Sequence, residues 1–98
     1  MSKLFVIYYT PGDSWQEGKP FMEQDLLAHG AYMKELYDDE VLTHGGPFLD
    51  DSGGMSIIKA ESLEAAQAIA DADPGVVNGV FRARLHPWFS VNWDDYKT

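Results

Sequence analysis

Residues 4–9 (LFVIYY) form an unbroken run of aliphatic, β-branched and aromatic side chains, closed by Thr10-Pro11-Gly12. A short run of this kind, bounded by turn residues, predicts a strand over Lys3 to Tyr9 that is buried on both faces. Residues 11–20 (PGDSWQEGKP) show no periodicity. They predict an irregular arm with one large apolar side chain, Trp15.

The segment from Phe21 to Glu40 carries one helical stripe. Its members are spaced by four, three, four and three residues, the spacing that places side chains on a single helix face. The stripe consists of Met22, Leu26, His29, Met33 and Leu36. The sequence therefore predicts a helix over the whole of 21–40, with a histidine on its inward side.

Residues 42–60 (LTHGGPFLDDSGGMSIIKA) place two short apolar runs on either side of a polar link rich in glycine. This pattern predicts a strand over Val41–Thr43, a wide loop and a strand over Met55–Ala60. A second helix is expected over Leu63–Ala72. Ser62 suits its N-cap, and the residue before Pro74 is disfavoured in helical backbone.

The last strand is expected over Gly79–Trp88, where apolar residues alternate with basic ones. A polar tail over residues 92–98 is expected to be loosely held. The predicted element order is β-α-β-β-α-β. This order indicates an α+β, ferredoxin-like domain, an antiparallel sheet with both helices on one face.

The other face of that sheet would be left bare, because the first strand is apolar on both sides. A second copy of the chain is the simplest cover, so we expect a homodimer. The chain has 98 residues, which predicts one domain over 1–98. Hydrophobic residues make up 45% of it, enough for a globular core.

The formal net charge of −9 excludes the usual basis of nucleic-acid binding and disfavours anionic membranes, because only seven Lys and Arg residues are present. The absence of cysteine excludes disulfides, thiolate nucleophiles and Cys-ligated zinc. We expect no nucleic-acid or membrane partner. With no secretory leader pattern at the N-terminus, the expected location is the cytoplasm.

His29 is the first candidate for chemistry. It lies on the apolar stripe of the first helix and should point toward the sheet. An ordinary imidazole titrates near neutral pH and can act as general acid or base. A core histidine that hydrogen-bonds a backbone carbonyl is an equal alternative.

Asp73 is the second candidate. The inner stripe of the second helix continues to it, which places the carboxylate at the last turn, where the helix dipole disfavours an anion. An imidazolium partner would offset that penalty, and a carboxylate would fix the tautomer of the ring. The alternative is an ordinary Asp-Pro helix stop.

Gly45-Gly46-Pro47 predicts a tight turn with unusual φ angles, with backbone N–H groups for a ligand as the less favoured alternative. No metal site is predicted, because His29, His44 and His86 show no ligand spacing and Asp50-Asp51 fits a solvated turn. Arg82 and Arg84 could hold an anion, but pairing with the chain's own carboxylates is favoured. We expect no cofactor.

Taken together, these residues resemble the YciI-like (YCII-related) family. The matching segments run from Leu4 to Trp88. They are His29-Gly30-Ala31-Tyr32-Met33, Gly45-Gly46-Pro47-Phe48, Gly53-Gly54-Met55, Asp73-Pro74, Gly79-Val80-Phe81 and His86-Pro87-Trp88.

The resemblance implies a ferredoxin-like fold, a dimeric α+β barrel and a site built on His29 and Asp73. One branch of the family is a dehydrochlorinase, so the resemblance also implies that acid–base lyase chemistry without a cofactor is within reach. The arm from Pro11 to Pro20 is longer than the link in many relatives, and His86 stands where arginine is expected before the Pro-Trp pair, so no substrate is carried over.

Three functional hypotheses follow, and the last is a dimer in which His29 and Asp73 only hold two helices on the sheet. The first is a small-molecule lyase, isomerase or hydrolase, in which His29 transfers a proton and Asp73 orients it. Its apolar pocket wall would include Phe48, Trp15 and Tyr32. The second is a non-catalytic dimeric module that binds a ligand or a protein.

Overall fold

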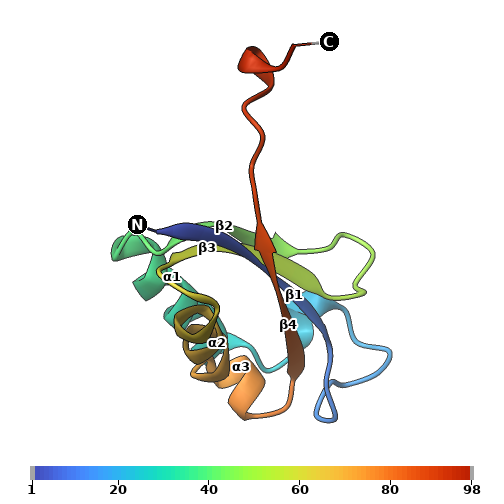
Figure 1. The fold of residues 1–98 in the computed structure, drawn as a ribbon. Coiled ribbons are helices and arrows are strands. Elements are labelled where there is room, and N and C mark those ends of the chain that lie inside the picture. Colours follow the sequence, from blue (N-terminus) through green and yellow to red (C-terminus); the bar gives the residue numbers. More distant parts are fainter. Residues whose placement is uncertain (1, 98) are drawn as a thin grey trace.

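Four antiparallel strands form one sheet in the order β2-β3-β1-β4, with the helices packed on one face (Figure 1). The computed structural model describes residues 2–97, so Met1 and Thr98, the ends of the predicted domain and tail, lie outside the described residues. The elements are β1 (Lys3–Pro11), η1 (Phe21–Glu23), α1 (Leu27–Asp38), β2 (Leu42–Pro47), β3 (Gly54–Ala60), α2 (Leu63–Asp71), α3 (Pro74–Val77), β4 (Phe81–Trp88) and η2 (Trp93–Asp95). The α+β, ferredoxin-like prediction is confirmed.

The core lies between the sheet and the helices. On β1 every second side chain faces inward, and Phe5, Ile7 and Tyr9 are almost fully buried there. Ala66 and Ala70 of α2 are buried against the sheet, because small side chains let a helix approach closely. Ser62 caps α2 as predicted, its hydroxyl accepting a hydrogen bond from the backbone N–H of Ala65.

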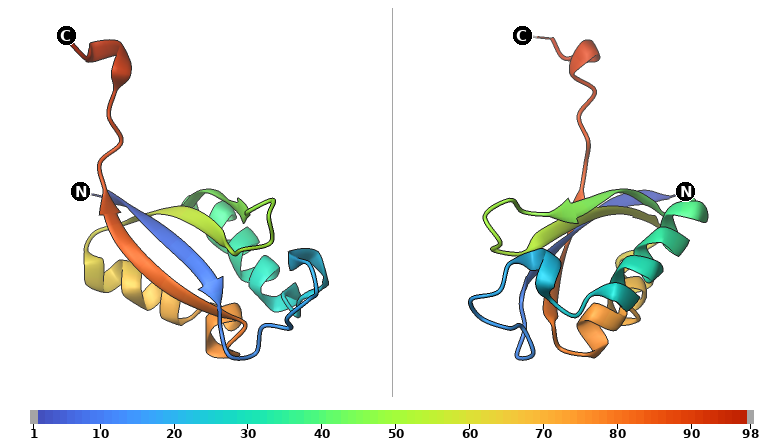
Figure 2. Two further views of the ribbon diagram at one scale, coloured as in Figure 1. Left: turned by 90° about the vertical axis from the view of Figure 1, so that its right-hand side faces the viewer. Right: turned by 180° about the vertical axis from the view of Figure 1, so that it is seen from behind.

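The opposite face of the sheet carries no helix, as the views in Figure 2 show. Tyr8 on β1 and Trp88 on β4 are 41% and 44% exposed there. In the single chain, β1 is therefore buried only on the face that the helices cover, and not on both faces as predicted.

The first helix is shorter than predicted. Residues 21–23 form only the 3₁₀ turn η1, and α1 begins at Leu27, so the prediction of one helix over 21–40 is wrong at its start. Met22, expected on the inner stripe, is 83% exposed. The chain stops being helical at Gln24, whose backbone is extended, and Gln24 turns its side chain back to the preceding loop.

Gln24 is one of the few buried polar residues, and its amide holds the irregular segment that precedes it. Its Oε1 accepts from the N–H of Gln16 at 2.8 Å, and its Nε2 donates to the carbonyls of Gln16 and Lys19, both at 2.9 Å. These three bonds fix the path of the chain between β1 and α1. The backbone groups of this segment thus bond to the Gln24 side chain, and the first turns of the predicted helix do not form.

The Gly45-Gly46-Pro47 segment is also different from the prediction. These residues continue β2 and pair with Ser56, Met55 and Gly54 of β3, so the predicted tight turn is wrong. A proline is tolerated because β2 is an edge strand. The turn lies further on, where Phe48 donates its N–H to the carbonyl of Gly53, a residue with φ of +146°.

No helix within residues 2–97 is long and apolar enough to cross a bilayer.

Replacing Gln24 with Ala should lower the free energy of unfolding by about 2 kcal/mol, because three hydrogen bonds to the preceding loop are lost at a buried position. Urea denaturation measures the difference. Glu23→Ala, an exposed change one residue away, serves as the matched control. Equal unfolding midpoints for the two variants would contradict this account of the loop.

Candidate active site

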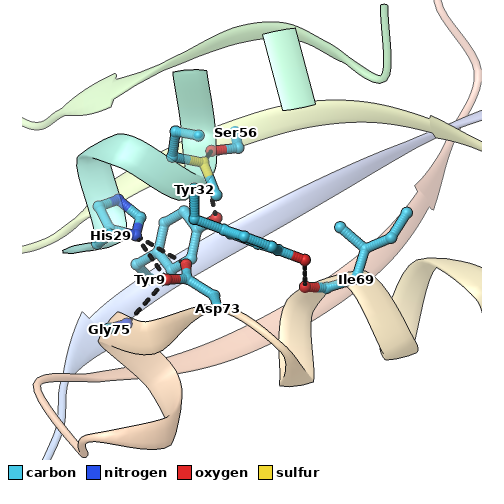
Figure 3. A network of polar contacts seen from close by, with 8 residues as sticks. Tyr9, His29, Tyr32, Ser56, Ile69, Asp73 and Gly75 are labelled. Carbon is cyan, nitrogen blue, oxygen red and sulfur yellow. Dashed lines mark hydrogen bonds and ion pairs between the residues drawn. The ribbon is translucent and has the colours of Figure 1, made fainter. Parts of the chain in front are cut away.

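His29 and Asp73 meet on the inner side of the sheet, although 44 residues separate them in the chain. His29 Nδ1 lies 2.7 Å from Asp73 Oδ2 and 2.9 Å from Oδ1 (Figure 3). The side chain of Asp73 is 1% exposed and that of His29 13%. The contact that the sequence left open is therefore present.

Asp73 does not end α2, as expected, but begins the next helix. Its backbone is extended, Pro74 occupies the first helical position of α3, and its Oδ1 accepts from the N–H of Gly75 at 2.8 Å. The carboxylate therefore caps a helix N-terminus and avoids the dipole penalty that the sequence predicted. The prediction of an inward-facing Asp73 holds, but its helical position was wrong.

Gly75 makes the close approach of these groups feasible. A Cβ built at this position would lie 3.1 Å from the Phe81 ring and 3.3 Å from both Asp73 Oδ1 and His29 Cβ. A larger residue would have to displace the Phe81 ring, the carboxylate or His29 by a few tenths of an ångström. Packing on all sides therefore fixes the pair as closely as the hydrogen bonds do.

Two aromatic rings hold the imidazole from its sides. The ring centroids of Tyr9 and Phe81 lie 5.6 Å and 5.1 Å from that of His29, both in edge-to-face geometry. The carboxylate of Asp73 can only accept a hydrogen bond, so Nδ1 carries the proton and Nε2 becomes the acceptor. Within the described residues, Nε2 makes no hydrogen bond, and it points away from Asp73 (Figure 3).

His29 lines a mostly apolar pocket of about 210 Å³ between α1 and the β2–β3 hairpin. The lining residues are Tyr9, Phe21, His29, Gly30, Met33, Leu42, Gly45, Gly46, Pro47, Gly54, Met55 and Ser56. The glycines of β2 matter because they leave this space open. A Cβ at Gly45 would lie 3.0 Å from the hydroxyl oxygen of Ser56.

Two hydroxyl groups in this pocket were missed by the sequence analysis. The hydroxyls of Tyr9 and Ser56 both approach the sulfur of Met33, at 3.9 Å and 3.7 Å. Thioether sulfur is a weak acceptor, and the two hydroxyls also contact each other, so a ligand oxygen would be a better partner for them. Ser56 could have been found from the sequence, because alternation along Met55–Ala60 places this polar side chain at an inward strand position.

Burial raises the pKa of Tyr9, and the charge of Asp73 acts in the same direction, although the hydrogen bond with Ser56 lowers it. Burial also raises the pKa of Tyr32. Tyr9 is therefore a neutral phenol and a hydrogen-bond donor across the physiological pH range.

The other expected wall residues lie elsewhere. Phe48 packs on Tyr8 at the bare face of the sheet, with ring centroids 5.6 Å apart. Trp15 packs on Phe21 and Phe81. Tyr32 donates its hydroxyl to the carbonyl of Ile69 at 2.7 Å and so ties α1 to α2. None of the three lines the pocket beside His29.

Potential metal ligands are scattered. Within residues 2–97, no three His or acidic side chains lie close enough together to hold a metal ion.

Comparison with known proteins gives a consistent family match. The family model of the YCII-related domain matches residues 1–88. Protein YciI from Escherichia coli O6:H1 is 37% identical, over 80% of this chain and 87% of the relative. The uncharacterized protein YjpA from Bacillus subtilis is 34% identical, over 69% of this chain and 80% of the relative.

One solved structure with the same fold is an enzyme. It is 5-chloro-2-hydroxyhydroquinone dehydrochlorinase (TftG) from Burkholderia phenoliruptrix AC1100, in complex with 2,5-dihydroxybenzoquinone. The TM-score is 0.68 at 27% identity, and the match covers 88% of this chain and 93% of that one.

Asp73→Asn should exchange the tautomer of His29. The new amide can still accept from the N–H of Gly75 with its oxygen, which turns its NH₂ group toward Nδ1 and moves the ring proton to Nε2. Two-bond ¹⁵N–¹H correlation spectra of the neutral ring distinguish the two forms. A ring that stays protonated at Nδ1 in the variant would show that Asp73 does not set the tautomer.

Stability should fall at alkaline pH, because the unfolded chain releases the Tyr9 proton near pH 10 whereas the folded protein retains it. Above that pH the loss approaches about 1.4 kcal/mol per pH unit. Tyr9→Phe should reduce this slope, while Tyr32 keeps part of it. Urea unfolding at a series of pH values measures the slope, with the exposed change Tyr37→Phe as the control. Identical slopes in both variants would contradict the assignment.

Proposed function

The chain belongs to the YCII-related domain family, and on this premise we propose that it is an enzyme that transfers protons on a small molecule. His29 would act as general base and acid, and Asp73 would orient it. The observation that carries the proposal is the free Nε2 of a carboxylate-bound imidazole at the wall of an apolar pocket. The reaction class is a lyase, isomerase or hydrolase step without a cofactor.

In the first step, Nε2 of His29 takes a proton from an O–H or C–H group of the ligand. The electron pair of that bond forms a new π bond, and in an elimination an anionic leaving group departs with its own bonding pair. The imidazolium that results is stabilised by the buried carboxylate of Asp73. Returning the proton to the leaving group or to solvent restores the neutral ring.

The hydroxyls of Tyr9 and Ser56 would bind an oxygen of the ligand. They now contact the weakly accepting Met33 sulfur and each other, so a ligand oxygen that gains negative charge during proton removal would be a much stronger partner. The remaining wall is largely apolar, which suits a compact ligand with few polar groups. The dehydrochlorinase with the same fold is named for 5-chloro-2-hydroxyhydroquinone, a compact single ring whose hydroxyl oxygens could accept from such donors.

We also propose that the chain forms a homodimer through the bare face of its sheet. Leu4, Val6 and Ile57 lie there together with the exposed Tyr8 and Trp88. A contiguous apolar sheet face is costly in water, and a second copy would bury both faces at once.

A non-catalytic, ligand-binding dimer is the second candidate function. The same pocket favours it, because a neutral histidine and two hydroxyls can bind a ligand without transforming it.

The first experiment uses 5-chloro-2-hydroxyhydroquinone as substrate and 2,5-dihydroxybenzoquinone as binding probe. We expect chloride release above the spontaneous rate, and a fall of about 100-fold or more in His29→Ala, because general acid–base catalysis is lost. A chloride electrode measures release, and calorimetry measures binding of the probe.

Lys34→Ala, an exposed change on the same helix, is the matched control and should retain the rate. Probe binding without chloride release would favour the binding module. Release that is unchanged in His29→Ala would contradict the catalytic role of the histidine.

A further inference from the structure

The segment after β4 projects from the folded domain. It continues away from the sheet and helices, as all views show (Figure 1, Figure 2). We name residues 89–97 the C-terminal arm. The match to the family model ends at residue 88, so the arm lies beyond it.

The arm is apolar at several positions and yet exposed. Phe89, Trp93 and Tyr96 are 81%, 69% and 58% exposed. The folded body thus buries little of these three aromatic side chains, although burying each of them away from water would be favourable. Exposed aromatics on a projecting segment indicate a surface that is completed by another molecule.

The tip of the arm is preformed. Residues 93–95 make the 3₁₀ turn η2, and the side chain of Asn92 accepts from the N–H of Asp94 at 3.1 Å. The amide of Asn92 also donates to Asp95 Oδ2, and the rings of Trp93 and Tyr96 pack 5.0 Å apart. A tip that is already ordered loses less entropy on docking than a disordered tail would.

The bare face of the sheet offers a matching surface, which we name the open sheet face. Cross-strand pairing places Leu4 beside Trp88, Val6 beside His86 and Tyr8 beside Arg84, on β1 and β4. Ile57 of β3 adjoins Val6 on the same face. The surface therefore combines an apolar strip with a basic edge.

The C-terminal arm and the open sheet face carry opposite charges. The arm carries Asp94 and Asp95, whereas β4 places Arg82 and Arg84 on the open sheet face. Arg82 pairs with Asp13 at 2.6 Å, but Arg84 makes no ion pair within the described residues. An arginine without an ion pair is unusual in a chain of net charge −9, and carboxylates are the groups with which it would pair.

We propose that the C-terminal arm of one copy docks on the open sheet face of a second copy, and that the second copy returns the same contact. Trp93 and Tyr96 would lie on the apolar strip, and Asp94 and Asp95 would lie near Arg84. The inference rests on the proposed dimer and goes beyond it, because each arm would cover part of the partner's open sheet face and the two sheets would cover only the remainder.

Reach and direction support a second copy as the partner. With η2 retained, the four extended residues 89–92 and the 3₁₀ turn span about 20 Å, roughly two thirds of the length of the nine-residue strand β1, so the arm can reach well along the sheet. Its own sheet is not available to it, since the arm leaves β4 pointing away from the body (Figure 2). A two-fold arrangement lets both arms dock in the same way.

The test compares dimer dissociation constants, measured by analytical ultracentrifugation over a dilution series, for full-length chains. The double variant Trp93→Ser with Tyr96→Ser should raise the dissociation constant at least about tenfold, because aromatic side chains dominate such interfaces. Lys97→Gln, a change on the same arm that keeps its aromatic side chains, should leave the constant unchanged. Urea unfolding checks that each variant folds.

A double variant that dimerises as tightly as the unmodified chain overturns the arm docking and leaves pairing through the sheet intact. An unmodified chain that is monomeric at every concentration overturns both. The catalytic proposal is read separately, from chloride release.

Charge reversal tests where the arm docks. Arg84→Glu should weaken the dimer, and so should Asp94→Arg combined with Asp95→Arg. All three changes in one chain should recover at least part of the affinity, because opposite charges face each other again. Failure to recover would overturn the placement of the tip beside Arg84.

Discussion

One buried carboxylate determines how the functional half of this structure is arranged. Asp73 is enclosed by the fold and accepts hydrogen bonds from the N–H of Gly75 and from His29. A buried carboxylate is costly unless its oxygens are hydrogen-bonded. Because His29 on α1 and Gly75 on α3 supply these bonds, the two helices must keep their relative positions. Glycine suits position 75 because a side chain there would crowd the carboxylate, His29 and the Phe81 ring.

The pocket follows from this constraint. Once Asp73 holds Nδ1, the imidazole lies between the rings of Tyr9 and Phe81 and presents Nε2 on the opposite side. The glycines of β2 leave space in front of it, and the nearby hydroxyls of Tyr9 and Ser56 contact the weakly accepting sulfur of Met33. An imidazole nitrogen without a partner among the described residues and two weakly bonded hydroxyls therefore share one apolar space.

The two faces of the sheet differ in what covers them. Helices and the site occupy the inner face, whereas the outer face and the C-terminal arm are both apolar and exposed in the single chain. The basic side chains of β4 and the acidic tip of the arm give these surfaces opposite charge. The chemistry and the proposed assembly are thus assigned to opposite sides of the same four strands.

The sequence by itself determined the element order, the ferredoxin-like fold, the Ser62 cap and the two residues of the dyad, because periodicity and capping are local and the family resemblance spans the chain. The tertiary structure decided the rest. Gly45-Gly46-Pro47 became a strand because β3 offers a partner for its backbone, Gln24 ended the expected helix because a distant loop needed its amide, and Asp73 became a cap through a helix of only four residues. Alternation along the strands turns Tyr9 and Ser56 inward, but only the packing of α1 brings both hydroxyls to the Met33 sulfur beside His29.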